Sequence, residues 1–303
     1  MKVLIIGSDT PVGQALCEYL EGRGTDFVGL PRSDCRWKSE RQAKKSLRRG
    51  DSDIAVDTRL QAAADGGTRI READVERCRW LSKACQNLKL PLILLSSAVV
   101  FKGAEGRPTR EEDYPNGTSA LAELLIAAEE AVRDHCERHV ILRMGPVFSP
   151  VGSTVLTYLL ERMHEQGRLA LSRNRKTCPV PAEDASRVIS GMIDQYACGL
   201  EAWGVYHYCS PDVTSDYEFA EVLLAAASQY RRFDPEHAAE LLSEENGESL
   251  EYRLHCDKIR DTFAIKQQPW RASVAGHVKQ LYLNRPPEEK TVGESYGHRD
   301  ASA

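Results

Sequence analysis

The sequence predicts an α/β protein with a doubly wound parallel sheet and a smaller C-terminal α/β lobe. Three observations lead to this fold class. Short apolar segments alternate with amphipathic helical patterns through the first half of the 303-residue chain. These segments are almost continuously apolar, as in strands buried on both faces of a parallel sheet. A glycine-containing turn, GSDTPVG, directly follows the first segment, where a Rossmann-type dinucleotide-binding turn would lie.

The expected elements of the first half follow in order along the chain. The expected strands are KVLIIG, DFVGL, SDIAVD, LPLILLSS and HVILRM. Amphipathic patterns predict helices over residues 14–22, 73–88 and 116–132, the last reading NGTSALAELLIAAEEAV. Parallel strands need crossover connections, so we expect these helices to cover the two faces of the sheet.

The pattern changes after about residue 150. A helix is expected over residues 154–167, followed by a short strand RLAL, a helix within CPVPAEDASRVISGMIDQY, a strand GVYHYC and a helix SDYEFAEVLLAAASQY. Ser215 is the expected N-cap of this last helix, and Glu218 would complete a capping box. We therefore expect a Rossmann-like NAD(P)-binding domain at residues 1–150 and a smaller lobe at 151–283, with some exchange of chain between them. Residues 284–303 are expected to be a disordered tail.

Composition excludes several classes of protein. Hydrophobic residues make up 42% of the chain, charged residues 28%, and the net charge is −5, so no general attraction to nucleic acid or an anionic membrane is expected. No apolar run approaches the roughly 20 residues that span a bilayer, and the N-terminal apolar run is too short for a secretory signal. Nine cysteines without a Cys-x-x-Cys pair indicate reduced thiols and a cytoplasmic location.

The turn GSDTPVG supplies the expected cofactor-binding residues Gly7, Thr10, Val12 and Gly13. The first glycine permits the tight turn, and Gly13 allows the helix to pack closely on the strand. Thr10 stands where a middle glycine would let the backbone approach a pyrophosphate, so its side chain is expected to crowd the phosphates. The turn alone therefore leaves open whether a cofactor binds. Arg32 ends the second strand without an acidic neighbour, and it would meet the 2′-phosphate of NADP or remain a solvated surface residue.

Several segments together resemble the extended short-chain dehydrogenase/reductase family, in its dTDP-4-dehydrorhamnose reductase (RmlD-like) branch. GVYHYCSPDVTSDYEFAEVLL is similar to the Gly-x-Tyr-His…Thr-Ser-x-Tyr-Glu-Phe-Ala stretch of that branch, and LSSAVVFKG to its Ser-Thr-Asp-Tyr-Val-Phe-x-Gly strand end. EEDYPNGTSA, ILRMGPVF and LHCDKIRDTFAIKQQPW resemble three further segments, so the resemblance covers residues 1 to about 282. It implies a Rossmann sheet with a substrate lobe, NADP(H) as the cofactor, and a keto group of a nucleotide-linked sugar as the substrate.

The resemblance also implies a catalytic Ser/Thr, Tyr and Lys, and the last two are missing here. The Ser/Thr position falls on Ser97. Aligning Ala128-Glu129 with the Gly-Glu of the family places Leu121 at the tyrosine and Leu125 at the lysine. No tyrosine in the chain is followed four residues later by lysine, the spacing that puts both on one helix face. The family tyrosine donates a proton with the help of the lysine charge, and leucines cannot do so.

A third departure lies after the expected strand SDIAVD. The small Asn-Ala-Ala-Ala run that lines the cofactor cleft in the family corresponds here to Asp57, Thr58, Arg59 and Leu60. The added bulk and charge are expected to narrow or close the cleft.

Other motifs favour structural roles. Residues 32–51 contain eight basic and three acidic residues and could bind phosphate or RNA with Trp37 as a stacking surface, but a solvated, charged helix is favoured. His135 and His139 have a one-turn spacing without a third ligand, so no metal site is expected. His207 is expected to be a core histidine, and Asp184 to cap a helix.

We therefore expect a catalytically degenerate RmlD-like protein that binds a nucleotide or nucleotide-sugar, or regulates a protein partner, in the manner of the regulatory subunit of methionine adenosyltransferase in the same branch. The alternative is an active NADPH-dependent reductase with another proton donor. A homodimer is compatible with both, and no membrane partner is expected. A third and less favoured hypothesis is a nucleic-acid or partner scaffold that uses the Arg/Lys-rich segment. We expect the side chains of Leu121 and Leu125 to face the cleft beside Ser97.

Overall fold

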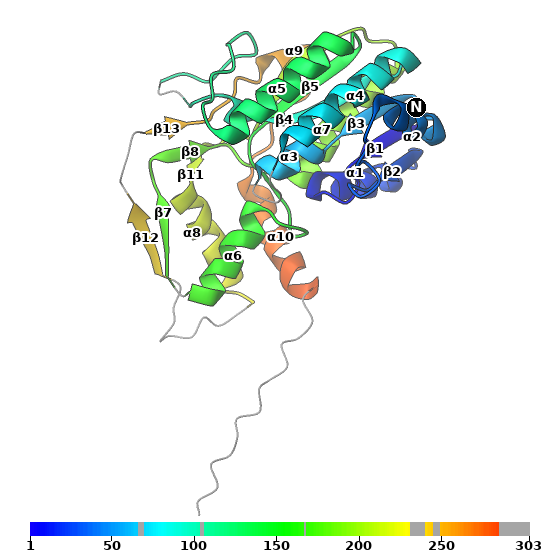
Figure 1. Ribbon diagram of the computed structural model, residues 1–303. Helices are drawn as coiled ribbons and strands as arrows, with labels where there is room; N and C mark the ends of the chain where they lie inside the picture. The colour runs from blue at the N-terminus through cyan, green and yellow to red at the C-terminus, as the bar shows by residue number, and fades with distance from the viewer. Residues whose placement is uncertain (66–69, 104–105, 167, 231–239, 245–248, 285–303) are drawn as a thin grey trace, which may run out of the picture.

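A six-stranded parallel sheet forms the centre of the computed structural model, which describes residues 1–65, 70–103, 106–166, 168–230, 240–244 and 249–284 (Figure 1). The order across the sheet is β10-β5-β4-β3-β1-β2, and each neighbouring pair is parallel. This confirms the predicted Rossmann-like sheet. The strands are β1 (Val3–Ile6), β2 (Phe27–Leu30), β3 (Ile54–Asp57), β4 (Leu92–Ser97), β5 (His139–Met144) and β10 (Gly204–Tyr208).

Burial explains why these segments form strands. Every residue of β1, β3 and β4 is buried, whereas β2, at the edge of the sheet, is mostly half-buried. Central strands of a parallel sheet have helices over both faces, so both sets of alternating side chains must be apolar or internally paired.

Helices cover both faces of the sheet. On one face, α1 (Pro11–Gly22) packs against α7 (Ala182–Ala197), and α9 (Asp257–Phe263) lies beside α7 and β10. On the other, α4 (Glu72–Leu88) packs between α2 (Glu40–Gly50) and α5 (Ala120–His135). The short helices α3 (Arg59–Ala64) and η1 (Ala98–Val100) follow the carboxyl ends of β3 and β4.

The lobe has its own hydrophobic core and lies beyond the carboxyl ends of the strands (Figure 1). The helices α6 (Val155–Gln166), α8 (Asp216–Ala227) and α10 (Arg271–Asn284) pack around the fully buried Trp270. Three small sheets border them. They pair β11 (Thr214–Ser215) and β13 (Leu250–Glu251) with β8 (Arg175–Thr177), β12 (Glu240–Glu244) with β7 (Arg168–Ser172), and β6 (Val147–Phe148) with β9 (Val180–Pro181).

The chain passes between the sheet and the lobe more than once. After β6, it builds α6 and the small strands of the lobe, and it then returns to the sheet as α7 and β10. Residues 151–283 therefore contribute the strand β10 and the covering helices α7 and α9 to the central unit. The expected tail from residue 284 lies, apart from Asn284 itself, outside the described residues.

Local signals behave as predicted at one helix and differently at another. Ser215 caps α8, with Glu218 N–H donating to its hydroxyl (3.1 Å) and the Glu218 carboxylate accepting from Ser215 N–H (3.0 Å). Asp184 was expected to cap α7, but Pro181 holds that position. Asp184 lies in the first turn, where its carboxylate binds Arg187 and the Tyr208 hydroxyl. In the described part of the chain, no helix has the length and apolarity needed to cross a bilayer.

Candidate functional site

The strand order reverses between β1 and β3, and the loops after these strands face one crevice. The chain turns to β2 on one side of β1 and to β3 on the other. In open α/β sheets, ligands bind at such a switch point, outside the carboxyl ends of the strands. The predicted residues Gly7, Thr10, Thr58 and Arg59 all lie here.

The two glycines of the turn are required by close packing. Gly7 has a φ of +84°, and a Cβ there would lie 2.8 Å from Arg59 Cγ and 2.8 Å from Thr58 Oγ1. A Cβ on Gly13 would lie 2.1 Å from the Gly7 carbonyl oxygen. Both positions therefore accept only glycine without backbone movement, in agreement with the roles expected from the sequence.

The side chain of Thr10 points into the protein, contrary to the expectation that it would crowd a pyrophosphate. It is fully buried, caps α1 by accepting a hydrogen bond from Gly13 N–H (3.0 Å), and lies 2.7 Å from the Thr58 hydroxyl. Pro11 occupies the first turn of α1, and the Val12 side chain is buried in the main core. The hydroxyl pair thus joins the loops after β1 and β3 beneath the crevice floor.

Asp57 and Arg59 form a buried ion pair on the wall of the crevice. Arg59 Nε lies 2.8 Å from Asp57 Oδ1, Nη2 lies 2.7 Å from Oδ2, and the guanidinium stacks over Trp37 at 5.1 Å. Burial favours the neutral form of Arg59, but the Asp57 carboxylate outweighs it and raises the pKa of the guanidinium. The Arg59 side chain therefore folds back onto the protein, and it narrows the crevice without filling it.

A cavity of about 570 Å³ remains beside this ion pair, within the roughly 300–1,000 Å³ range of small-molecule sites. Arg32 lines it at the end of β2, with its Nε 2.9 Å from Asp9 Oδ2. Arg77 likewise pairs with Asp74 (2.6 Å). The full lining is Asp9, Arg32, Ser33, Cys35, Arg36, Arg59, Leu60, Ala63, Ile70, Arg71, Asp74 and Arg77.

Charge in this arginine-lined cavity is not balanced. Three of its five guanidinium groups are paired with carboxylates, as just described. Arg36 and Arg71 are exposed, and within the described ranges neither has a carboxylate partner. Two uncompensated positive charges in one concave site match the charge of a phosphate monoester near neutral pH. The arginines were visible in the sequence, but their spacing did not indicate that Arg71 and Arg36 would line the same cavity.

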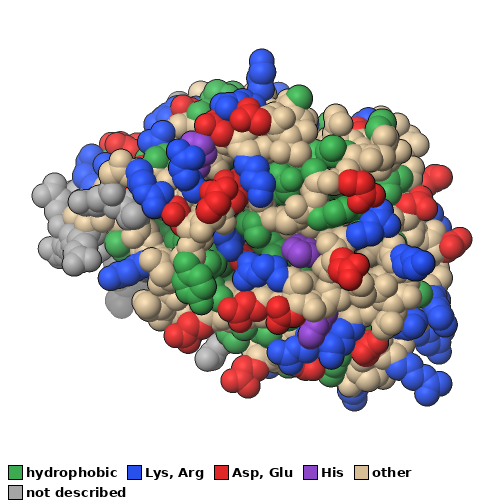
Figure 2. Space-filling view, turned by 90° about the horizontal axis from the view of Figure 1, so that it is seen from above, with side chains coloured by type: hydrophobic (Ala, Val, Ile, Leu, Met, Phe, Trp, Pro, Cys, Tyr) green, Lys and Arg blue, Asp and Glu red, His purple; other side chains and the backbone are tan. Residues whose placement is uncertain are grey.

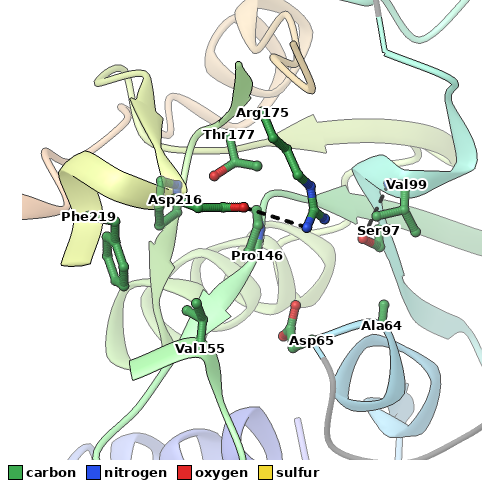
Figure 3. Close-up of a pocket in the computed structure, with 11 residues that line it drawn as sticks. Ala64, Asp65, Ser97, Val99, Pro146, Val155, Arg175, Thr177, Asp216 and Phe219 are labelled. Atoms are coloured by element: carbon green, nitrogen blue, oxygen red, sulfur yellow. Dashed lines mark hydrogen bonds and ion pairs between the residues drawn. The ribbon is translucent and has the colours of Figure 1, made fainter. Parts of the chain in front are cut away.

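Ser97, the retained family position, lines a second, smaller cavity of about 130 Å³ between the sheet and the lobe (Figure 3). Its hydroxyl accepts a long hydrogen bond from Val99 N–H (3.4 Å). In the part of the chain that the structure describes, no tyrosine hydroxyl donates to Ser97. The lining is Ala64, Asp65, Ser97, Val99, Pro146, Val155, Arg175, Thr177, Pro179, Asp216 and Phe219.

Two carboxyl groups and one guanidinium make this Ser97 cavity polar. Burial raises the pKa of Asp65 well above its usual range, more than its hydrogen bonds with Val147 N–H and Gln61 lower it. Burial also raises the pKa of Asp216, opposed by Arg175, whose Nη1 lies 3.8 Å from Asp216 Oδ2. Sequence reasoning missed these three residues because they come from three separate segments.

Leu121 and Leu125 do not line the Ser97 cavity. Leu125 is 1% exposed and belongs to the main core, and Leu121 is half-buried against the same core. Both lie on α5, which is capped by Ser119 and packs on η1 and β4. The expectation that both leucines face the cavity is therefore not met, although α5 begins directly beside the strand end that carries Ser97.

The remaining motifs have structural roles. α5 ends at His135 and β5 begins at His139, so these histidines do not share a helix face, contrary to their one-turn spacing in the sequence. Among the described residues, no three His, Cys, Asp or Glu side chains are grouped to hold a metal. His207 is a buried core histidine, as expected, near Thr109 O (3.2 Å). Trp37 is 4% exposed, which removes it as a stacking surface.

Comparison with known proteins relates the whole architecture to one family. The family model described as "RmlD substrate binding domain" matches residues 1–283. A dTDP-4-dehydrorhamnose reductase of Sinorhizobium fredii is 27% identical over 84% of this chain and 89% of that protein. One of Escherichia coli K12 is 22% identical over 93% and 98% of the respective chains.

Solved structures give the same fold. A Bacillus anthracis dTDP-4-dehydrorhamnose reductase in complex with NADP has a TM-score of 0.76 at 16% identity, covering 92% of this chain and 98% of that one. A Clostridium acetobutylicum dTDP-4-dehydrorhamnose reductase has a TM-score of 0.75 at 15% identity, covering 93% and 99%. The chain therefore belongs to the RmlD substrate-binding domain family, with the extended short-chain dehydrogenase-like fold of that family.

Proposed function

We propose that this chain binds NADP(H) at the switch-point crevice and a nucleotide-linked sugar beside Ser97, and that it acts by binding or regulation without hydride transfer. The arginine-lined cavity is the observation that carries the binding half of the proposal. Its uncompensated Arg36 and Arg71 complement the 2′-phosphate that distinguishes NADP from NAD. The Bacillus anthracis structural neighbour with NADP supports the same choice of cofactor.

The absence of hydride transfer is proposed because of the residues at two positions of α5. Leu121 and Leu125 correspond to the proton-donating tyrosine and its lysine, and Leu125 lies in the apolar core. A keto group that accepts a hydride also needs a proton, and general acid catalysis contributes about 10²–10⁴-fold in rate. A cavity of about 130 Å³ also falls well below the roughly 300–1,000 Å³ of typical ligand sites, so a sugar would require the lobe to move.

Titration of the full chain with NADPH and with NADH, followed by nucleotide fluorescence, tests the binding half. We expect NADPH to bind more tightly than NADH, and the double substitution Arg36→Gln/Arg71→Gln to weaken NADPH by tenfold or more while leaving NADH unchanged. Lys279→Gln, at an exposed cation on α10, is the matched control. Equal affinity for the two nucleotides, or no effect of the arginine substitutions, would refute the proposed site.

Oxidation of NADPH with a dTDP-linked 4-keto-sugar, measured at saturating nucleotide, tests the catalytic half. We expect no turnover above the uncatalysed rate.

An active NADPH-dependent reductase is the second candidate. It is favoured by relatives named dTDP-4-dehydrorhamnose reductase that match 75–93% of this chain, and by the carboxyl group of Asp65 in the Ser97 cavity. Turnover by the unmodified chain would establish this function in place of the non-catalytic one.

A further inference from the structure

Five basic side chains occupy one face of α2. They lie at positions i, i+3, i+4, i+7 and i+8, which is the spacing of a single helical face. The opposite side of the helix carries Ala43 and Leu47, both buried in the main core. This α2 basic face borders a surface hollow of about 330 Å³ and consists of Arg41, Lys44, Lys45, Arg48 and Arg49.

None of these five cations has a carboxylate partner within the described ranges of the chain. The acidic residue at the start of the helix, Glu40, accepts a hydrogen bond from Asn87 (2.9 Å). Like charges at i, i+4 destabilise a helix. The helix dipole compensates Arg48 and Arg49 in the last turn, but not Arg41, Lys44 or Lys45. An external anion would relieve this repulsion.

The chemistry of the face distinguishes between classes of partner. Protein interfaces have an apolar core with few charges, whereas the apolar residues of α2 already face inward. Trp37, the nearby aromatic residue, is buried and its indole N–H binds Ser46 Oγ (3.0 Å), so no base can stack on it. A row of cations without apolar or aromatic anchors fits a phosphodiester backbone.

We propose that the α2 basic face docks on the phosphodiester backbone of a double-stranded nucleic acid, without reading its sequence. The nine residues from Arg41 to Arg49 rise about 12 Å along the helix. Duplex DNA presents about seven phosphate charges over that length on its two strands together, so five contacts would draw on both strands across a groove. Charges more than about 10 Å from the face are screened at 0.1 M salt, so the net charge of −5 opposes docking mainly through the flanking Glu40 and Asp51. Basic side chains gather along the edge of the molecule that carries α2 (Figure 2).

Fluorescence anisotropy with a labelled 20-base-pair duplex, as DNA and as RNA, tests the proposal on the full chain. Five phosphate contacts predict a slope of log K against log salt of about −4.5, which is about a 500-fold loss of affinity between 50 and 200 mM NaCl. Lys45→Gln/Arg49→Gln should reduce the slope to about −2.7. Lys266→Gln/Lys279→Gln removes two exposed charges elsewhere and should leave the slope unchanged.

Three results would overturn the proposal. They are no duplex binding at 50 mM NaCl, equal slopes for the α2 variant and the unmodified chain, and binding of polyglutamate but not of the duplex. Circular dichroism of each variant confirms that the helix is retained. NADPH titration of the same variants separates this face from the switch-point crevice, since neither substitution touches the arginine-lined cavity.

Discussion

Glu129 and Arg143 form a buried ion pair that fixes α5 against the sheet. Arg143 Nη2 lies 2.6 Å from Glu129 Oε2, and its Nε lies 3.0 Å from Oε1. Ser96 Oγ donates to the same carboxylate (2.6 Å). Glu129 is 0% and Arg143 1% exposed. The pair joins α5, the helix that carries Leu121 and Leu125, to the strands β4 and β5.

We predict that Glu129→Gln destabilises the protein by about 3–5 kcal/mol, because it leaves the buried Arg143 guanidinium without an anion. At roughly 2 °C per kcal/mol for a chain of this size, the midpoint of thermal unfolding should fall by roughly 6–10 °C. Arg143→Met should cost less, because Arg133 Nη1 still lies 3.3 Å from Glu129 Oε2 and keeps that carboxylate paired. Glu129→Gln/Arg143→Met removes both charges, so its cost should be roughly 2–3 kcal/mol less than the sum of the single costs.

Urea unfolding followed by circular dichroism, with thermal unfolding in parallel, measures the stability of the unmodified chain, the two single variants and the double variant. Ser82→Ala removes a buried hydroxyl on α4 that bonds only within its own helix, and it serves as a control with a small expected effect. Additive single costs in the double variant, or a Glu129→Gln shift below about 2 °C, would show that the pair is not the electrostatic clamp described here.

Three further predictions concern positions outside this pair. Gly7→Ala should destabilise the chain by about 1–3 kcal/mol in urea unfolding, since φ is +84° and the new Cβ would meet Arg59 and Thr58; Gly22→Ala, with open space around it, should not destabilise. Burial lowers the pKa of His277, but its ion pair with Glu183 (2.7 Å) outweighs this and raises it above 6.5. His277 thus contributes stability below pH 6.5 that disappears as pH rises through the raised pKa, so a stability cost of His277→Gln at pH 6 that persists undiminished at pH 9 would contradict the assignment. Ser215→Ala should cost about 1 kcal/mol in urea unfolding by removing the cap of α8, whereas Ser33→Ala should cost nothing.

The fold was predictable because its signals are local. The strands β1, β3 and β4 are continuous apolar runs in the sequence and are buried throughout in the structure. The capping box at Ser215 needs only residues three apart. Gly7 and Gly13 were read correctly because a turn between strand and helix imposes the same backbone demands in any sequence context.

The site was less predictable because the orientations of its side chains depend on residues far away in the sequence. Thr10 turns inward because Thr58, 48 residues away, offers a hydroxyl partner at 2.7 Å. Asp65, Arg175 and Asp216 meet only after the lobe has folded over the sheet. α5 ends at His135, three residues beyond the predicted end at residue 132, because no glycine or proline in the sequence marks its end.

The return of the chain to the sheet as α7 and β10 has a consequence for truncated forms of the protein. β10 covers the open edge of β5 through five residue pairs, from Gly204 opposite Val140 to Tyr208 opposite Met144. A fragment ending at residue 150 would present that edge unpaired, together with the apolar surface of α1 that α7 normally covers. Exposed edges of this kind pair with other chains. The sheet therefore depends on the segment that follows the lobe for its protection from aggregation.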